Sequence, residues 1–190
     1  YCDFAEAIEG ESFNYNYVEW KEVDYSKFTA ASAEAIDWAQ VDYKDARKED
    51  DFWGHVDFQE AITQDFKYSY VDWTEINYSS LDTADTTAMD WTQVDYKKAL
   101  KSESFELDVC DWGEINSAKS SKIKKVYKDI DWKKIEYSTL ETDTLDDLNW
   151  ARVDFKEATN AKDFDLGYCD WGQINSAKSS DRKKICPMMA

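Results

Sequence analysis

The chain has 190 residues, only 5 Gly and 1 Pro, 16% aromatic residues and a formal net charge of −18. This composition excludes a disordered or linker-rich chain, and the length is enough for one domain with a real core. The acidic charge argues against direct binding to nucleic acid or to an anionic membrane surface, and no stretch reaches the roughly 18 apolar residues of a membrane span.

The acidic charge is concentrated in the first half of the chain. Residues 1–100 hold 23 Asp and Glu against 8 Lys and Arg, and residues 101–190 hold 18 against 15. The two parts therefore carry net charges of −15 and −3. Such a field favours cations or basic partners at the acidic end.

An aromatic motif, W-x-x-[VI]-[DNE]-[YFS], recurs along the chain and contains all nine tryptophans. Residues 2–7 (CDFAEA) match the second half of a unit, so the chain begins in the middle of a repeat. The last six steps between successive tryptophans are two copies of 20, 18 and 21. A longer repeat, which brings Trp112 onto Trp171, is therefore superimposed on a unit of about 20 residues.

Apolar residues hold fixed places around each tryptophan. They stand mostly two residues before it and three, five and eight residues after it. A helix would need spacings of three and four, so the pattern favours short strands that turn a corner every five residues. We expect an all-β fold, a single-chain β-solenoid of about nine to ten coils, each of about 20 residues.

Three segments carry a family resemblance: IDWAQVDYKDA (residues 36–46), MDWTQVDYKKA (89–99) and LNWARVDFKEA (148–158). They resemble the pentapeptide-repeat family, whose unit is A-[D/N]-L-x-x. The resemblance covers two pentads per coil along most of the chain, and it implies a right-handed β-helix with Asp or Asn facing out at the corners. Because Trp is bulkier than the usual Leu or Phe, a wider or flattened coil is expected. The same segments also resemble repeats of large bacterial surface proteins.

The repeat register predicts one repeat domain over residues 1–180, with superrepeats at approximately 1–52, 53–111 and 112–180 and a tail at 181–190. The tryptophans then point inward as a core ladder, and each indole N–H needs an internal acceptor such as a backbone carbonyl. Cys110 and Cys169 stand at inward positions and are expected to be buried thiols. The ladder consists of Trp20, Trp38, Trp53, Trp73, Trp91, Trp112, Trp132, Trp150 and Trp171.

The residue before each tryptophan is mostly acidic. In stacked coils these carboxylates would lie about 5 Å apart and repel by about 1 kcal/mol even in water. Capping of corner backbone N–H groups, calcium bridging, and imitation of DNA remain open as reasons for the row. No cofactor is expected, and calcium is the one alternative that stays open. Its candidate ligands are Asp37, Asp72, Asp90, Asp111, Asp131 and Asp170.

Two basic segments follow equivalent positions of the longer repeat. They are either solvated loops or a patch that docks the acidic end of another copy. The patch consists of Lys119, Lys122, Lys124, Lys125, Lys178, Arg182, Lys183 and Lys184.

The sequence contains no P-loop, dinucleotide-binding, nucleophile-elbow or zinc-protease motif, which favours a non-enzymatic protein. We expect a structural or assembly module, a segment of a larger bacterial surface or filament-forming protein that stacks head-to-tail with its partner copies. Two alternatives stay open: an acidic DNA mimic that binds a topoisomerase, and a calcium-binding adhesin-like repeat. An extracellular or cell-surface location is favoured.

Overall fold

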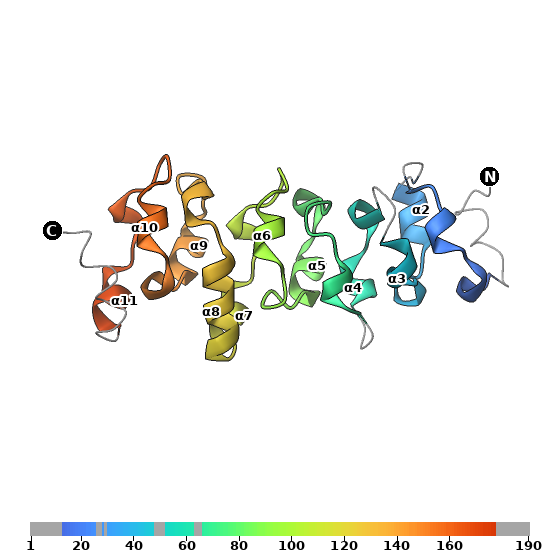
Figure 1. Ribbon diagram of the computed structural model, residues 1–190, viewed down its shortest axis with the longest axis horizontal. Helices are drawn as coiled ribbons and strands as arrows, with labels where there is room; N and C mark the ends of the chain where they lie inside the picture. Colours follow the sequence, from blue (N-terminus) through green and yellow to red (C-terminus); the bar gives the residue numbers. More distant parts are fainter. Residues whose placement is uncertain (1–12, 26–27, 29, 48–51, 63–65, 178–190) are drawn as a thin grey trace. The chain divides into compact units, whose positions relative to one another are not determined.

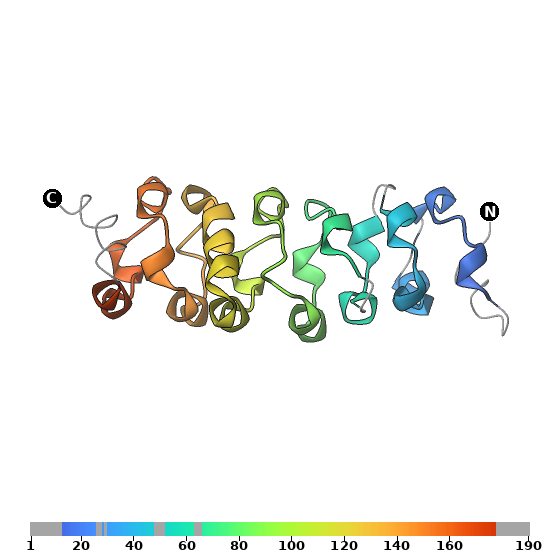
Figure 2. The same ribbon diagram turned by 60° about the horizontal axis from the view of Figure 1, so that its bottom comes forward.

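A computed structural model describes residues 13–25, 28, 30–47, 52–62 and 66–177. Within those ranges the regular structure consists of short α-helices and 3₁₀ turns, with no β-strand (Figures 1 and 2). The expected all-β β-solenoid is therefore wrong, as is the right-handed β-helix that the pentapeptide-repeat resemblance implied. No helix in this part of the chain is long and apolar enough to cross a membrane. The predicted tail at 181–190 lies outside the described residues.

The chain divides into two compact units, Tyr1–Met89 and Asp90–Ala190. The elements of the first unit are η1 (Tyr15–Tyr17), η2 (Trp20–Glu22), α2 (Ala30–Ala35), η4 (Trp38–Gln40), α3 (Tyr43–Ala46), η5 (Phe52–His55), α4 (Phe58–Ala61), η6 (Tyr68–Tyr70), η7 (Tyr78–Ser80) and α5 (Thr83–Ala88). The elements of the second are α6 (Tyr96–Ala99), η8 (Leu107–Val109), α7 (Trp112–Ser117), α8 (Ser120–Asp129), η9 (Trp132–Lys134), α9 (Thr142–Asp147), η10 (Trp150–Arg152), α10 (Phe155–Ala158), η11 (Leu166–Tyr168) and α11 (Trp171–Ser176).

The turns arise from the same apolar offsets that were expected to give strands. The offsets advance by two, three, two and three residues, and only the steps of two are extended. Val41, for example, ends η4 in an extended conformation with φ −68° and ψ 134°. The steps of three are single helical turns, and at several of them an Asp before the aromatic residue accepts hydrogen bonds from the first backbone N–H groups of the turn. Asp37 does this for η4, and Asp42 does it for α3.

Within each unit, a repeat packs against the one before it. Helices α3, α4, α10 and α11 contact η2, η4, η9 and η10, each of which begins about one repeat earlier in the chain. The longest helix, α8, contacts α6 and α7 and buries Ile123, Val126 and Tyr127. The basic segment around Lys122 is therefore one face of an amphipathic helix, and the expectation of a loop there is wrong.

The core of both units is aromatic. Eight tryptophans, from Trp20 to Trp150, are at most 3% exposed, whereas Trp171 is half-buried. Tyrosines and phenylalanines five residues after them fill the space between, and Tyr78, Tyr96 and Tyr137 are almost fully buried. Cys110 and Cys169 are also buried. The burial of so much aromatic surface stabilises helical turns that are too short to persist alone.

Candidate functional site

The polar atoms of the aromatic core side chains make a recurring hydrogen bond to the backbone carbonyl five residues earlier. The indole N–H groups donate to backbone carbonyls five residues earlier over 2.8–3.2 Å, for Trp38, Trp112, Trp132, Trp150 and Trp171. Tyrosine hydroxyls likewise donate over 2.7–3.1 Å to the carbonyl of the tryptophan five residues earlier, for Tyr25, Tyr43, Tyr78, Tyr96 and Tyr137. The Trp53 indole N–H is the buried side-chain donor of the described residues that lacks an acceptor. The ladder therefore has a structural role in the core.

The acidic residues before the tryptophans contact their own turns. Asp37, Asp72, Asp90, Asp111 and Asp170 accept backbone N–H groups two or three residues later over 2.7–3.2 Å. Asp131 forms an ion pair with Lys134 at 3.6 Å. Among the described residues no group of three or more His, Cys, Asp or Glu side chains is placed to hold a metal ion. The contacts of the first five carboxylates are those that the capping explanation requires, whereas Asp131 makes no such cap.

A second set of caps joins successive repeats. The backbone N–H groups of Trp38, Trp91 and Trp132 donate to the carboxylates of Glu60, Glu114 and Glu157, over 3.1, 3.0 and 3.3 Å. The N–H of Trp150 donates to the amide oxygen of Gln173 over 3.0 Å. Each cap therefore reaches back along the chain by about one repeat, and each repeat completes the start of a turn in the repeat before it.

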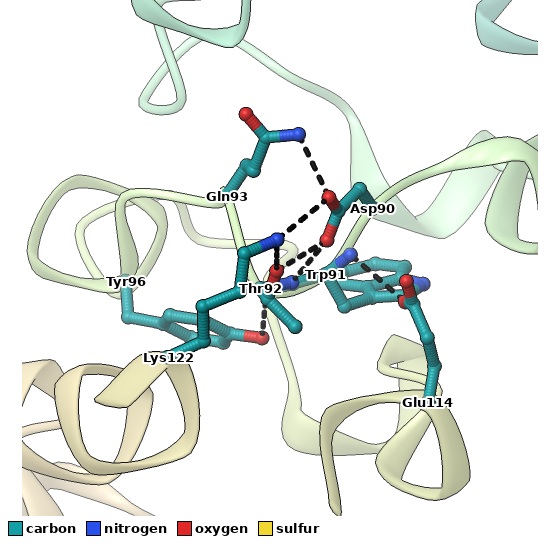
Figure 3. A network of polar contacts seen from close by, with 7 residues as sticks. All are labelled: Asp90, Trp91, Thr92, Gln93, Tyr96, Glu114 and Lys122. Atoms are coloured by element: carbon teal, nitrogen blue, oxygen red, sulfur yellow. Dashed lines mark hydrogen bonds and ion pairs between the residues drawn. The ribbon is translucent and has the colours of Figure 1, made fainter. Parts of the chain in front are cut away.

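Figure 3 shows a polar network around Asp90 and the turn of Trp91. The Asp90 carboxylate accepts the Thr92 backbone N–H and the Gln93 side-chain amide over 3.0 and 2.7 Å. Lys122 of α8 reaches the same carboxylate over 3.3 Å and the Thr92 hydroxyl over 2.8 Å. Burial disfavours the charged form of Asp90, but the hydrogen bonds from Thr92, Gln93 and Lys122 outweigh it and lower its pKa. Lys122 and Asp90 thus neutralise each other within this network.

The carboxylate of Glu114 contacts the same turn, at the backbone N–H of Trp91 (Figure 3). Its pKa is shifted in the direction opposite to that of Asp90. Partial burial raises its pKa, and the nearby charges of Asp90 and Asp111 add to that effect, whereas the Trp91 N–H lowers it. The charged carboxylate that caps Trp91 is therefore destabilised by partial burial and by two nearby acids.

The residues of the predicted basic patch differ in their contacts. Lys122 and Lys125 are engaged with Asp90 and Asp129, over 3.3 and 2.9 Å, and Lys97 also pairs with Asp129 over 3.2 Å. Lys119 and Lys124 are exposed. The remaining members of the patch, Lys178, Arg182, Lys183 and Lys184, lie outside the described residues. Of the four patch lysines that the structure describes, two are therefore held in ion pairs within unit Asp90–Ala190.

Two cavities lie in the described part of the chain. One of about 270 Å³ is lined by Phe105, Ile135 and Glu136, among others, and one of about 370 Å³ by Tyr43, Phe66 and Tyr70. Neither lining contains a His or a Cys, so neither offers the imidazole base of a catalytic triad.

A contrast between two near-identical repeats singles out one surface. The segment DWGEINSAKSS at residues 111–121 returns as DWGQINSAKSS at 170–180, and both form a helix of the same length, α7 and α11. In the internal copy, Leu107 is 1% exposed and Trp112 is buried. Their counterparts in the later copy, Leu166 and Trp171, are 47% exposed and half-buried. The difference lies in what covers the two helices, since the local fold is the same.

Tyr127 provides much of the cover in the internal copy. Its ring centroid is 5.7 Å from that of Trp112, and its hydroxyl donates to Asn116 Oδ1 over 3.2 Å while accepting the Asn149 N–H over 2.7 Å. Burial in this site raises the pKa of Tyr127 to about 12. Sequence reasoning missed Tyr127 and Asn116; the available signal was a tyrosine five residues before Trp20, Trp73 and Trp132.

The surface formed by Leu166, Trp171 and Asn175 is called the terminal face below. In the described residues, no side chain accepts the Trp171 backbone N–H as Gln173 accepts that of Trp150. Asn175 is exposed, unlike its counterpart Asn116. The terminal face therefore presents the ring, the N–H and the amide that a following repeat covers elsewhere.

The chain was also compared with known proteins. A scan against models of protein families finds no match, and neither a search of curated proteins nor a search of solved structures finds one.

Proposed function

We propose that this chain is a non-enzymatic assembly module that associates with further copies of its own repeat through the terminal face. The observation that supports the proposal is the matched pair of repeats, of which one has Leu107 at 1% exposure and the other has Leu166 at 47%. A surface that completes its core only when another repeat stacks on it is a natural site of association. Extended assemblies follow when such a contact does not close on itself.

The physical basis of the association is the same burial that holds the repeats together inside the chain. A fully buried Leu side chain contributes about 1.5–3 kcal/mol, and a tryptophan ring adds further area. Because micromolar affinity corresponds to about 8 kcal/mol after the entropy of association is subtracted, these two side chains alone support only weak association, and neighbouring surface must be buried with them. The chain is thus proposed to associate reversibly and in a concentration-dependent way.

Sedimentation velocity over a hundredfold concentration range tests this, with reductant present so that Cys2 and Cys186 cannot cross-link. We expect the weight-average mass to rise with concentration. Leu166→Glu places a charge on the terminal face and is expected to weaken association by about tenfold or more. Leu140→Glu, at another half-buried leucine of the same unit, serves as the matched control and should associate like the parent chain. A chain that remains monomeric at every concentration contradicts the proposed function.

A further inference from the structure

We propose that the terminal face is covered by Tyr15 of a second copy, which takes the place that Tyr127 takes over Trp112 inside the chain. This inference rests on the proposed function and names its partner. In the assembled state the ring of Tyr15 packs on Trp171, and its hydroxyl donates to Asn175. The contact joins the first described repeat of one copy to the last of another, which makes it heterologous and able to propagate.

Tyr15 matches Tyr127 in each feature that belongs to its own copy. Both stand five residues before a tryptophan and stack on it, with centroids 6.0 Å apart at 25° for Tyr15 and 5.7 Å apart at 26° for Tyr127. Both hydroxyls accept a backbone N–H from the following repeat over 2.7 Å, that of Asp37 for Tyr15 and that of Asn149 for Tyr127. Tyr15 is thus already held in the conformation that Tyr127 uses.

The two tyrosines differ in whether the hydroxyl hydrogen has an acceptor. Tyr127 donates its hydroxyl hydrogen to Asn116 of the preceding repeat. Among the described residues, no acceptor receives the Tyr15 hydroxyl, and Asn175, the counterpart of Asn116, has no partner. Within the described residues, the Tyr15 hydroxyl is therefore a donor without an acceptor and Asn175 is an acceptor without a donor, and Tyr127 and Asn116 make this pairing inside the second unit.

The longer repeat does not place a tyrosine at the position equivalent to Tyr127. When the two copies of the longer repeat are aligned on Trp112 and Trp171, Tyr127 corresponds to Cys186 and Lys128 to Pro187. A cysteine provides neither an aromatic ring nor a strong hydroxyl donor. Of the other two tyrosines that stand five residues before a tryptophan, Tyr68 lies inside the repeat series, and Tyr15 is the one in the first described turn.

Charge favours the same pairing of ends. Residues 1–25 hold 7 Asp and Glu against 1 Lys, whereas residues 166–190 hold 4 Lys and Arg against 2 Asp. The local net charges are therefore −6 and +2. At physiological salt, screening over about 8 Å limits the repulsion between whole acidic chains and leaves the attraction between adjoining ends. Two N-terminal ends or two C-terminal ends lack this complementarity.

Mixing two variants that are each defective at one end tests the inference. Tyr15→Ala removes the proposed donor end and leaves the terminal face intact; Trp171→Ala or Asn175→Ala does the reverse. Each variant alone is expected to remain monomeric at concentrations where the parent chain associates, with affinity reduced about tenfold for Asn175→Ala and more for the aromatic truncations. An equimolar mixture of Tyr15→Ala with Trp171→Ala is expected to form dimers and nothing larger, as measured by sedimentation velocity in reductant. Asn175→Ala, an exposed substitution, keeps the test independent of any folding defect caused by Trp171→Ala.

Tyr17→Ala is the matched control, because Tyr17 is 86% exposed, lies two residues from Tyr15 and has no place in the contact. It should associate like the parent chain. If Tyr15→Ala and Asn175→Ala associate as well as the parent chain, the inference is overturned while the proposed function stands. If Tyr15→Ala alone still forms dimers, the terminal faces meet each other symmetrically and the inference is again overturned. A parent chain that never associates overturns both.

Discussion

At the scale of the residue, Glu114 and Gln173 allow a charged cap and an uncharged cap to be compared at equivalent positions. They occupy equivalent positions in the two copies of the longer repeat, and each accepts a tryptophan backbone N–H of the preceding repeat over 3.0 Å. The amide makes the same contact as the carboxylate without bringing a charge near other acids. Since the pKa of Glu114 is raised by partial burial and by Asp90 and Asp111, the carboxylate is the less favourable of the two at neutral pH.

Glu114→Gln is therefore expected to increase the free energy of unfolding at pH 7. The folded pKa of Glu114 lies above its ordinary value of 4.5, so the folded state binds this proton more tightly than the unfolded state. Stability from this group is thus present below pH 4.5 and is lost as the pH rises through the folded pKa. The advantage of Gln should shrink on acidification, which urea unfolding between pH 4 and pH 8 measures. Glu114→Ala, which leaves the Trp91 N–H without its acceptor, should be less stable than Glu114→Gln by about 1 kcal/mol at every pH. An increase for Ala equal to that for Gln would contradict the role of the cap.

At the scale of the element, the helices are too short to form by propensity and depend on their caps. Asp154 precedes α10 and accepts the Lys156 and Glu157 backbone N–H groups over 3.0 and 3.3 Å. Asp154→Ala is expected to lower the free energy of unfolding by about 1 kcal/mol, whereas Asp154→Asn, which can still cap, should remain within a few tenths. Asp146→Ala, at an exposed position inside α9, is the control and should change stability by less than about 0.5 kcal/mol. Chemical unfolding followed by tryptophan fluorescence measures all three, and equal losses at Asp154 and Asp146 would refute the capping argument.

The elements show what the sequence could predict and what it could not. The repeat register predicted the inward position of the tryptophans and the carbonyl acceptors of their indoles, and the structure contains both. The strands were wrong because a five-residue period fits two geometries, a β corner and a capped helical turn. The three-residue step from Trp38 to Val41, preceded by Asp37, is a helical signature, as is the spacing of Ile123, Val126, Tyr127 and Ile130 in and after α8.

The terminal face was beyond reach of the sequence pattern for a different reason. Trp112 and Trp171 have nearly identical sequence neighbours, so nothing local distinguishes a covered helix from an uncovered one. The cover comes from Tyr127, which lies in the helix after that of Trp112 and whose hydroxyl accepts the backbone N–H of Asn149, one repeat further along the chain. Only the three-dimensional packing brings these residues together.

At the scale of the whole molecule, the two compact units differ in how much charge they must hold. Residues 1–89 carry 21 Asp and Glu against 6 Lys and Arg, a net of −15, and residues 90–190 carry 20 against 17, a net of −3. Self-repulsion destabilises a compact state with a high net charge, and salt relieves it. The first unit is therefore expected to be the more sensitive to ionic strength.

The second unit should fold when it is produced alone as residues 90–190. Several of its contacts lie within it: Lys122 pairs with Asp90, and the caps from Glu114, Glu157 and Gln173 all reach tryptophans of the same unit. In a repeat protein, stability is close to a sum of the repeats and their neighbouring interfaces, so a contiguous block that keeps these interfaces keeps its stability. We expect the fragment to show helical far-ultraviolet and ordered near-ultraviolet circular dichroism, with a cooperative thermal transition that added salt, at about 0.5 M, shifts less than that of residues 1–89. A fragment of the second unit without ordered tryptophan signals would mean that these local caps and the aromatic core they align are not sufficient to hold the repeats together.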